Sequence, residues 1–422
     1  MKYGYALLVM WGLLLGGCGT DLHQPVEEKV SGGKKVVDLS GQVIKQFLLD
    51  NNASGVDANT TVYGMKAYKI IYDSVGIDGN PVKASGYMVV PQGMPAVVED
   101  QFGFSLVSDD HGTIFANREA PTVMPELTMM PSRDSSIIFT ALGGFVTLMP
   151  DYVGYGESHG EVHPFVLKNP LAEDTVRFIK AARAFAQDNG IKLNGQLFVT
   201  GYSEGGYAAM ATLQKIESDA EMQVAMAAPM AGPYDLNRTA FGVLSQPQLA
   251  VPSFMAFVAY AYSTAYDEAI DTVVNEPYAS KLPSLFDGSK TREEIDPQLT
   301  TDTTGATGLF NPLFVQQFFA DDSQWFRQAV VQNSVHAWAP QTPVRLIHCQ
   351  GDGVIPFGIS QVAAGTMQAL GASSVTLVPV EAALQQAGQG DGSLMGHAEC
   401  APFAYGIAAQ SFAAVRQATV GY

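Results

Sequence analysis

The most constraining feature of this sequence is the hexapeptide Gly201-Tyr202-Ser203-Glu204-Gly205-Gly206. It follows an apolar, β-rich segment at residues 196–200 and precedes residues 207–215, which are rich in helix-forming side chains. A strand, a tight turn bounded by glycines and a helix are the setting in which Gly-x-Ser-x-Gly forms a nucleophile elbow. The glycines are needed because so sharp a turn crowds the backbone. We therefore predict that Ser203 is presented at the end of a buried strand.

A serine hydroxyl becomes a good nucleophile only beside a base that a carboxylate orients. On an elbow of this kind the acid and then the histidine follow the serine along the chain. His397 is the histidine in a loop after the last predicted strand, and Asp352 follows the predicted strand at 344–349. Asp391 is a later alternative for the acid, but it lies in the loop that must carry the histidine. The other histidines lie in the N-terminal segment, before the serine, in a helical region or within a strand: His23, His111, His159, His163, His336 and His348.

An acyl-transfer site also needs backbone N–H groups that stabilise the oxyanion. One such donor comes from the residue after the nucleophile, and a second comes from the loop after the third core strand. These positions predict the amide of Glu204 and the amide of Thr113, with Gly112 as the next alternative.

Two further motifs point to other chemistry and are weaker. Gly156-Glu157-Ser158-His159-Gly160 also matches Gly-x-Ser-x-Gly, but a loop separates it from its strand and Pro164 stands where a helix should begin. His159 and His163 have a spacing that would suit zinc on a helix, yet Gly160 and Pro164 disfavour a helix and no third ligand is evident. We predict no metal site and no cofactor.

Strands that alternate with helices predict an α/β fold with a mostly parallel central sheet flanked by helices. Residues 65–72 and 82–90 around Asp-Gly-Asn-Pro predict an N-terminal β-hairpin. Between residues 232 and 341 aromatic and Met-rich helical stretches replace the alternation, and we interpret them as an inserted helical cap that lines an acyl pocket. The predicted organisation is a signal peptide, a tether, the first part of the core, the cap and the second part of the core, at residues 1–17, 18–37, 38–231, 232–341 and 342–422.

The N-terminus predicts export. A lysine and a short apolar stretch precede Leu15-Gly16-Gly17-Cys18, which resembles a bacterial lipobox with Cys18 as the lipidated residue. We therefore expect a protein of the bacterial cell envelope that is anchored by lipid, at the outer membrane on its periplasmic side or at the cell surface. An ordinary signal peptide is the alternative. Cys349 and Cys400 are then a candidate disulfide or two buried thiols. Nucleic acid is an unsuitable partner, because 41 acidic residues against 23 basic ones give a formal charge of −18.

Taken together, the elbow, His-Gly-Thr at 111–113, Asp-Tyr-Val-Gly-Tyr-Gly-Glu-Ser at 151–158, Gly-Asp-Gly-Val-Ile-Pro at 351–356 and the late Gly-His resemble the α/β-hydrolase superfamily. More closely, they resemble its bacterial secreted lipase- and esterase-like members that carry a helical cap. The similarity runs from about residue 60 to the C-terminus. Asp110 departs from this pattern, since relatives usually have an uncharged residue there. A carboxylate at that place would oppose the oxyanion unless its side chain points away.

These observations predict a serine hydrolase that cleaves small-molecule or lipid carboxylic esters. Ser203 would be the nucleophile, His397 the base and Asp352 the orienting acid. One alternative is a serine peptidase with the same triad. A second alternative is a non-catalytic envelope binding module on a hydrolase scaffold, which the three filled triad positions disfavour.

Overall fold

The computed structural model describes residues 28–30, 33–51, 53, 55–124 and 135–422. The predicted signal peptide and Cys18 lie outside the described residues. The predicted tether, 18–37, is wrong where it is described, because β1 (Glu28–Val30) and β2 (Gly33–Leu39) belong to the sheet. β2 pairs antiparallel with the next strand, so it satisfies backbone groups that would otherwise form an open edge.

The described residues form one ten-stranded sheet in the order β1-β2-β3-β4-β6-β5-β7-β8-β9-β10. Its first part is antiparallel, and the strands from β6 to β10 in that order pair in parallel. The predicted α/β class with a parallel core is confirmed. The remaining strands are β3 (Gly64–Val75), β4 (Pro81–Gln92), β5 (Phe104–Asp110), β6 (Val146–Pro150), β7 (Leu193–Tyr202), β8 (Met226–Met230), β9 (Val344–His348) and β10 (Val375–Pro379).

The predicted hairpin is also confirmed. β3 and β4 pair along their whole length, from Gly64 opposite Gln92 to Val75 opposite Pro81. The turn between them contains Gly79 at φ 82°, a conformation that glycine adopts without strain.

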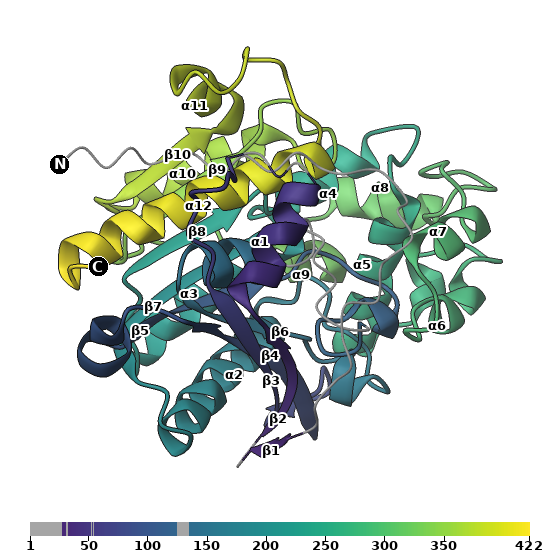
Figure 1. The fold of residues 1–422 in the computed structure, drawn as a ribbon. Helices are drawn as coiled ribbons and strands as arrows, with labels where there is room; N and C mark the ends of the chain where they lie inside the picture. The colour runs from purple at the N-terminus through teal and green to yellow at the C-terminus, as the bar shows by residue number, and fades with distance from the viewer. Residues whose placement is uncertain (1–27, 31–32, 52, 54, 125–134) are drawn as a thin grey trace.

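Helices cover both faces of the sheet (Figure 1). One face packs against α2 (Lys168–Asp188), α3 (Glu204–Asp219) and α10 (Phe357–Ala369). The other face packs against α1 (Gly41–Asp50), the turn Ile137–Leu142, α11 (Val380–Gln386) and α12 (His397–Thr419). The parallel strands therefore lie between two apolar layers, which accounts for their continuous apolar runs.

The chain between β8 and β9 is helical. Figure 1 shows most of these helices, in green, gathered at one end of the molecule. They are α4 (Leu236–Leu244), α5 (Pro252–Ala265), α6 (Leu282–Leu285), α7 (Arg292–Ile295), α8 (Pro312–Ala320) and α9 (Trp325–Asn333).

The aromatic residues of this region pack largely against one another. Phe257 of α5 stacks on Phe286 and Phe165 at 4.5 and 4.7 Å between ring centroids. Phe254 and Tyr260 of the same helix are only partly buried. Within the described part of the chain, no helix is both long enough and apolar enough to cross a membrane.

Candidate active site

Ser203 stands at the junction of β7 and α3 in a strained conformation, with φ 62° and ψ −121°. A non-glycine residue with positive φ is uncommon and indicates that the surroundings impose the conformation. Its own amide donates to the Met230 carbonyl of β8 at 2.9 Å, and its carbonyl accepts from the Tyr207 amide at 3.2 Å. These bonds fix the backbone, so the side chain has a defined position above the sheet.

The glycines of the motif are required by close backbone approach. A Cβ on Gly205 would lie inside contact distance of the Asp110 carbonyl at the end of β5, and a Cβ on Gly201 would meet the same oxygen. A Cβ on Gly206 would meet the Met230 carbonyl. The elbow is therefore packed against the two strands that flank β7 in the sheet.

The structure brings the three predicted triad residues together. Ser203 Oγ lies 2.9 Å from His397 Nε2, and His397 Nδ1 lies 2.6 Å from Asp352 Oδ2. A carboxylate only accepts, so Nδ1 of His397 carries a proton and Nε2 is left to accept from the serine hydroxyl. This is the tautomer that a general base at Nε2 requires.

His397 reaches this position from a helix rather than from a loop. The sequence analysis placed His397 in a loop after the last predicted strand, whereas α12 begins at His397 itself. Tyr202, next to the nucleophile, donates from its hydroxyl to the His397 carbonyl at 2.6 Å. The first turn of α12 is thus tied directly to the elbow.

Asp352 accepts hydrogen bonds at both of its oxygens. Oδ1 accepts from the amides of Val354 and Ile355, both at 2.9 Å. Oδ2 accepts from His397 and also from His348 Nε2, the latter at 3.0 Å. Burial alone would raise the pKa of Asp352, but the bonds from His348 and His397 outweigh it and hold the pKa well below its ordinary value. Asp352 is therefore ionised near neutral pH, as the predicted orienting acid must be.

His348 is a residue that the sequence analysis set aside because it lies within a strand before the acid. It is the last residue of β9 and is fully buried. Its Nε2 also faces the Ile355 carbonyl at 3.0 Å, so this nitrogen must be a donor. Its Nδ1 lies 2.7 Å from Ser360 Oγ. The available signal was its place at the carboxyl end of a parallel strand, where sites of such sheets lie.

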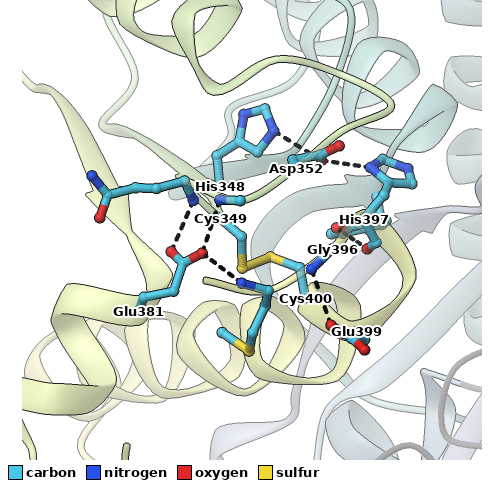
Figure 2. Close-up of a disulfide and its surroundings, with 12 residues drawn as sticks. His348, Cys349, Asp352, Glu381, Gly396, His397, Glu399 and Cys400 are labelled. Carbon is cyan, nitrogen blue, oxygen red and sulfur yellow. Dashed lines mark hydrogen bonds and ion pairs between the residues drawn. A yellow bond between two sulfur atoms is a disulfide. The ribbon is translucent and has the colours of Figure 1, made fainter. Parts of the chain in front are cut away.

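A disulfide joins the acid loop to the first turn of α12 (Figure 2). Cys349 follows His348, and Cys400 lies one turn after His397. The buried carboxylate of Glu381 on α11 adds a second connection. It accepts from the amides of Gln350 and Gly351 in the acid loop at 2.8 and 3.1 Å. It also accepts from the amide of Met395, just before His397, at 3.2 Å.

The predicted oxyanion loop lies beside the nucleophile. A Cβ built on Gly112 would be 3.6 Å from Ser203 Cβ. Tyr152 donates to the His111 carbonyl at 3.1 Å, and Tyr155 donates to the Ile114 carbonyl at 2.5 Å. These two bonds hold the loop on either side of Gly112 and Thr113.

Asp110, the departure from the expected pattern, is turned away from this loop. It is fully buried, and its Oδ1 accepts from Thr175 Oγ1 on α2 at 3.1 Å. Burial raises the pKa of Asp110 well above its ordinary value, and this favours the neutral acid. Asp110 thus binds to α2, and its burial disfavours a charge on it.

The residues of the two weaker motifs make local structural contacts. Ser158 of the second Gly-x-Ser-x-Gly match is buried and donates to the Tyr155 carbonyl at 2.9 Å. His159 is exposed, whereas His163 is buried and lies 2.7 Å from the Glu204 carboxylate. The described residues contain no group of three or more potential ligands arranged to hold a metal ion.

Comparison with known proteins identifies the fold. No family model matches the chain, and no curated protein matches it in sequence. Among solved structures, a Legionella pneumophila protein assigned as a hydrolase aligns with TM-score 0.79 and 22% identity over 93% of this chain and 99% of that one. The rice cell wall degrading esterase LipA from Xanthomonas oryzae aligns with TM-score 0.75 and 24% identity over 93% and 97%. Candida antarctica lipase A aligns with TM-score 0.56 and 13% identity over 75% and 72%.

The fold of this chain is therefore that of the α/β-hydrolases, as the sequence resemblance implied. The solved structures that it resembles in fold include a hydrolase, an esterase and a lipase. The site at the carboxyl ends of β5, β7 and β9 can transfer a proton from a hydroxyl to an imidazole that a carboxylate orients.

Proposed function

We propose that this protein is a serine hydrolase that cleaves carboxylic esters through an acyl-enzyme. Ser203 Oγ attacks the acyl carbonyl while its proton passes to His397 Nε2, and Asp352 stabilises the imidazolium. The amides of Glu204 and Thr113 hold the oxyanion. His397 then protonates the leaving alcohol. Water, deprotonated by His397, releases the acid and restores Ser203.

The observation that carries the proposal is the continuous hydrogen-bonded chain from Ser203 through His397 to Asp352, with the serine on a strained elbow. The buried carboxylate, the imidazole tautomer and the adjacent oxyanion loop all suit acyl transfer. The likeness to an esterase and a lipase favours esters among acyl substrates.

We propose further that the acyl group is apolar. The oxyanion loop leads directly into Phe115, which stacks on Phe254 of the cap at 5.8 Å. Phe254, Met255, Val258 and Tyr260 of α5 are only partly buried and present apolar surface in this region. Such side chains suit an aliphatic or aromatic acyl chain better than a charged one.

The direct test is hydrolysis of p-nitrophenyl esters of increasing acyl length by wild type and Ser203→Ala. We expect the wild type to hydrolyse these esters and Ser203→Ala to lose nearly all of this activity. Labelling by a fluorophosphonate probe should follow the same pattern. A folded wild type that is neither labelled nor active would favour a binding module.

A parallel panel of aminoacyl-nitroanilides separates esterase from peptidase. The proposal requires ester turnover to exceed amide turnover. Amide turnover without ester turnover would replace the esterase assignment with a peptidase, although the same triad would be in use.

We also propose that the protein is exported and anchored by lipid at Cys18 in the bacterial cell envelope. A disulfide such as Cys349–Cys400 forms and persists in an oxidising compartment. Metabolic labelling with a fatty acid should mark the wild type and not Cys18→Ser. Labelling of both proteins would show that the anchor is elsewhere.

A further inference from the structure

The proposed mechanism uses the backbone amide of Glu204 and gives its side chain no role. It is 2% exposed and contacts His163, which is 3% exposed, at 2.7 Å between Oε1 and Nε2. A carboxylate so close to an oxyanion donor is unexpected, because a negative charge there opposes the charge that develops on the substrate. The charge that Glu204 carries in the folded protein therefore bears directly on the stability of the oxyanion.

The hydrogen bonds of His163 determine the net charge of the pair that it forms with Glu204. Its Nδ1 lies 2.9 Å from the Val153 carbonyl, which only accepts, so Nδ1 carries a proton. The contact between Nε2 and Glu204 then holds one further proton. With that proton on nitrogen the pair is imidazolium and carboxylate, and with it on oxygen the pair is imidazole and carboxylic acid. In both cases the pair has no net charge.

The pair is also enclosed by the groups that hold the oxyanion loop. The His163 ring lies 5.7 Å from the Tyr152 ring and 4.9 Å from the Tyr155 ring. These are the two tyrosines whose hydroxyls bind the carbonyls of His111 and Ile114. Phe257 of the cap completes the enclosure at 5.7 Å. Within the described residues, His163 is the ion-pair partner of Glu204.

We propose that His163 is a positioning residue that neutralises Glu204, so that the helix after the nucleophile can keep a buried acid without repelling the oxyanion. This inference rests on the proposed function. His163 acts through Glu204 and the two tyrosines, and it touches no reacting atom.

The test is a set of four proteins: wild type, Glu204→Gln, His163→Gln and the double variant. Glu204→Gln removes the charge and keeps a donor for His163, so its kcat should fall by less than that of His163→Gln. His163→Gln leaves the carboxylate without a compensating charge. Its kcat should fall about ten- to a hundredfold, less than the hundred- to thousandfold that loss of a whole oxyanion donor causes. The double variant has no charge at either position, and its kcat should return to that of Glu204→Gln.

A purely structural role predicts a different order, because two disrupted contacts would then be worse than one. An unchanged kcat in His163→Gln would overturn the proposal, and so would a double variant as slow as His163→Gln. His159→Gln is the matched control, since it makes the same substitution on an exposed histidine of the same loop. It should leave kcat unchanged.

The Tm of each protein gives a readout that does not depend on turnover. An unpaired buried charge destabilises a fold, so His163→Gln should lower Tm and the second substitution should restore it. If the wild type neither turns over esters nor takes the fluorophosphonate label, the proposed function fails by itself. The order of the four Tm values then still decides whether the pair is neutral as a unit, and a double variant with the lowest Tm would refute it.

Discussion

His348 and His397 donate hydrogen bonds to the same oxygen, Oδ2 of Asp352, at 3.0 and 2.6 Å. The two imidazoles come from different elements, the end of β9 and the start of α12. One carboxylate oxygen therefore accepts from two histidines. His397 also contacts Ser203, whereas His348 is fully buried. His348 consequently limits how strongly Asp352 stabilises the imidazolium of His397.

His348→Phe should change the pH dependence of the reaction as well as its rate. Without this donor the pKa of Asp352 rises toward its ordinary value, so Asp352 becomes protonated sooner as the pH falls and the acid limb of kcat/KM moves to higher pH. We expect kcat to fall about ten- to a hundredfold because the carboxylate is held less firmly. The pH–rate profile measures both the shift of the acid limb and the fall in kcat. Ser360→Ala is the control, since it keeps the bond between His348 and Asp352, and its profile should stay close to that of wild type.

Gly205→Ala tests the close packing of the elbow. Its Cβ would collide with the Asp110 carbonyl, which belongs to backbone and cannot move aside. We expect a loss of about 3 kcal/mol or more in the free energy of unfolding. Gly160→Ala, in the second Gly-x-Ser-x-Gly match, meets no atom within 4 Å and should change stability by less than about 0.5 kcal/mol. Denaturant titration compares them, and equal effects would contradict the packing argument.

Removal of the disulfide should lower both stability and activity. Cys349 and Cys400 are separated by 51 residues, and a cross-link over such a loop contributes about 4 kcal/mol through chain entropy. Cys349→Ala with Cys400→Ala should lose stability of that order. It should also lower kcat, since the acid loop and α12 are held by the same bond. Thiol titration of denatured, unreduced protein should detect the thiol of neither Cys349 nor Cys400.

Asp174 should make the protein less stable as the pH rises. It is a buried residue of α2, and its Oδ1 accepts from Tyr72 and Ser74 of β3 at 3.0 and 2.6 Å. Burial raises the pKa of Asp174 from 3.8 to about 6. The folded state thus keeps a proton that the unfolded chain has already released between pH 4 and 6, and folding stability falls over this interval and is level above it.

Substitution Asp174→Asn should flatten this interval. The contribution of one such group is at most about 3 kcal/mol. Free energies of unfolding measured from pH 4 to 7.5 give the slope for each protein. Parallel slopes in wild type and variant would show that Asp174 is not the group responsible.

The sequence was sufficient for the parts of the molecule that local patterns govern. The alternation of strands and helices, the hairpin at β3 and β4 and the elbow at Ser203 each follow from periodicity, turn residues or glycine spacing. The order of Ser203, Asp352 and His397 along the chain selected three residues that the structure brings within hydrogen-bond distance.

What the sequence did not reveal depends on contacts between distant segments. Residues 33–37 of β2 were assigned to the tether because the segment that leads to them is polar and aperiodic, whereas pairing with β3 places them in the sheet. His348 was set aside because it lies within a strand before the acid, yet its position at the end of β9 brings it to Asp352. His163 and Glu204 are 41 residues apart, and no local pattern connects them.

The helical region between β8 and β9 has a further consequence. These two strands are parallel neighbours in the sheet, so the region is a single crossover that leaves the carboxyl end of β8 and returns to the amino end of β9. Ser203 precedes this interruption, while Asp352 and His397 both follow it. The helices can therefore be lengthened, shortened or exchanged over evolutionary time without altering how the reacting groups meet, and substrate preference can diverge while the chemistry stays the same.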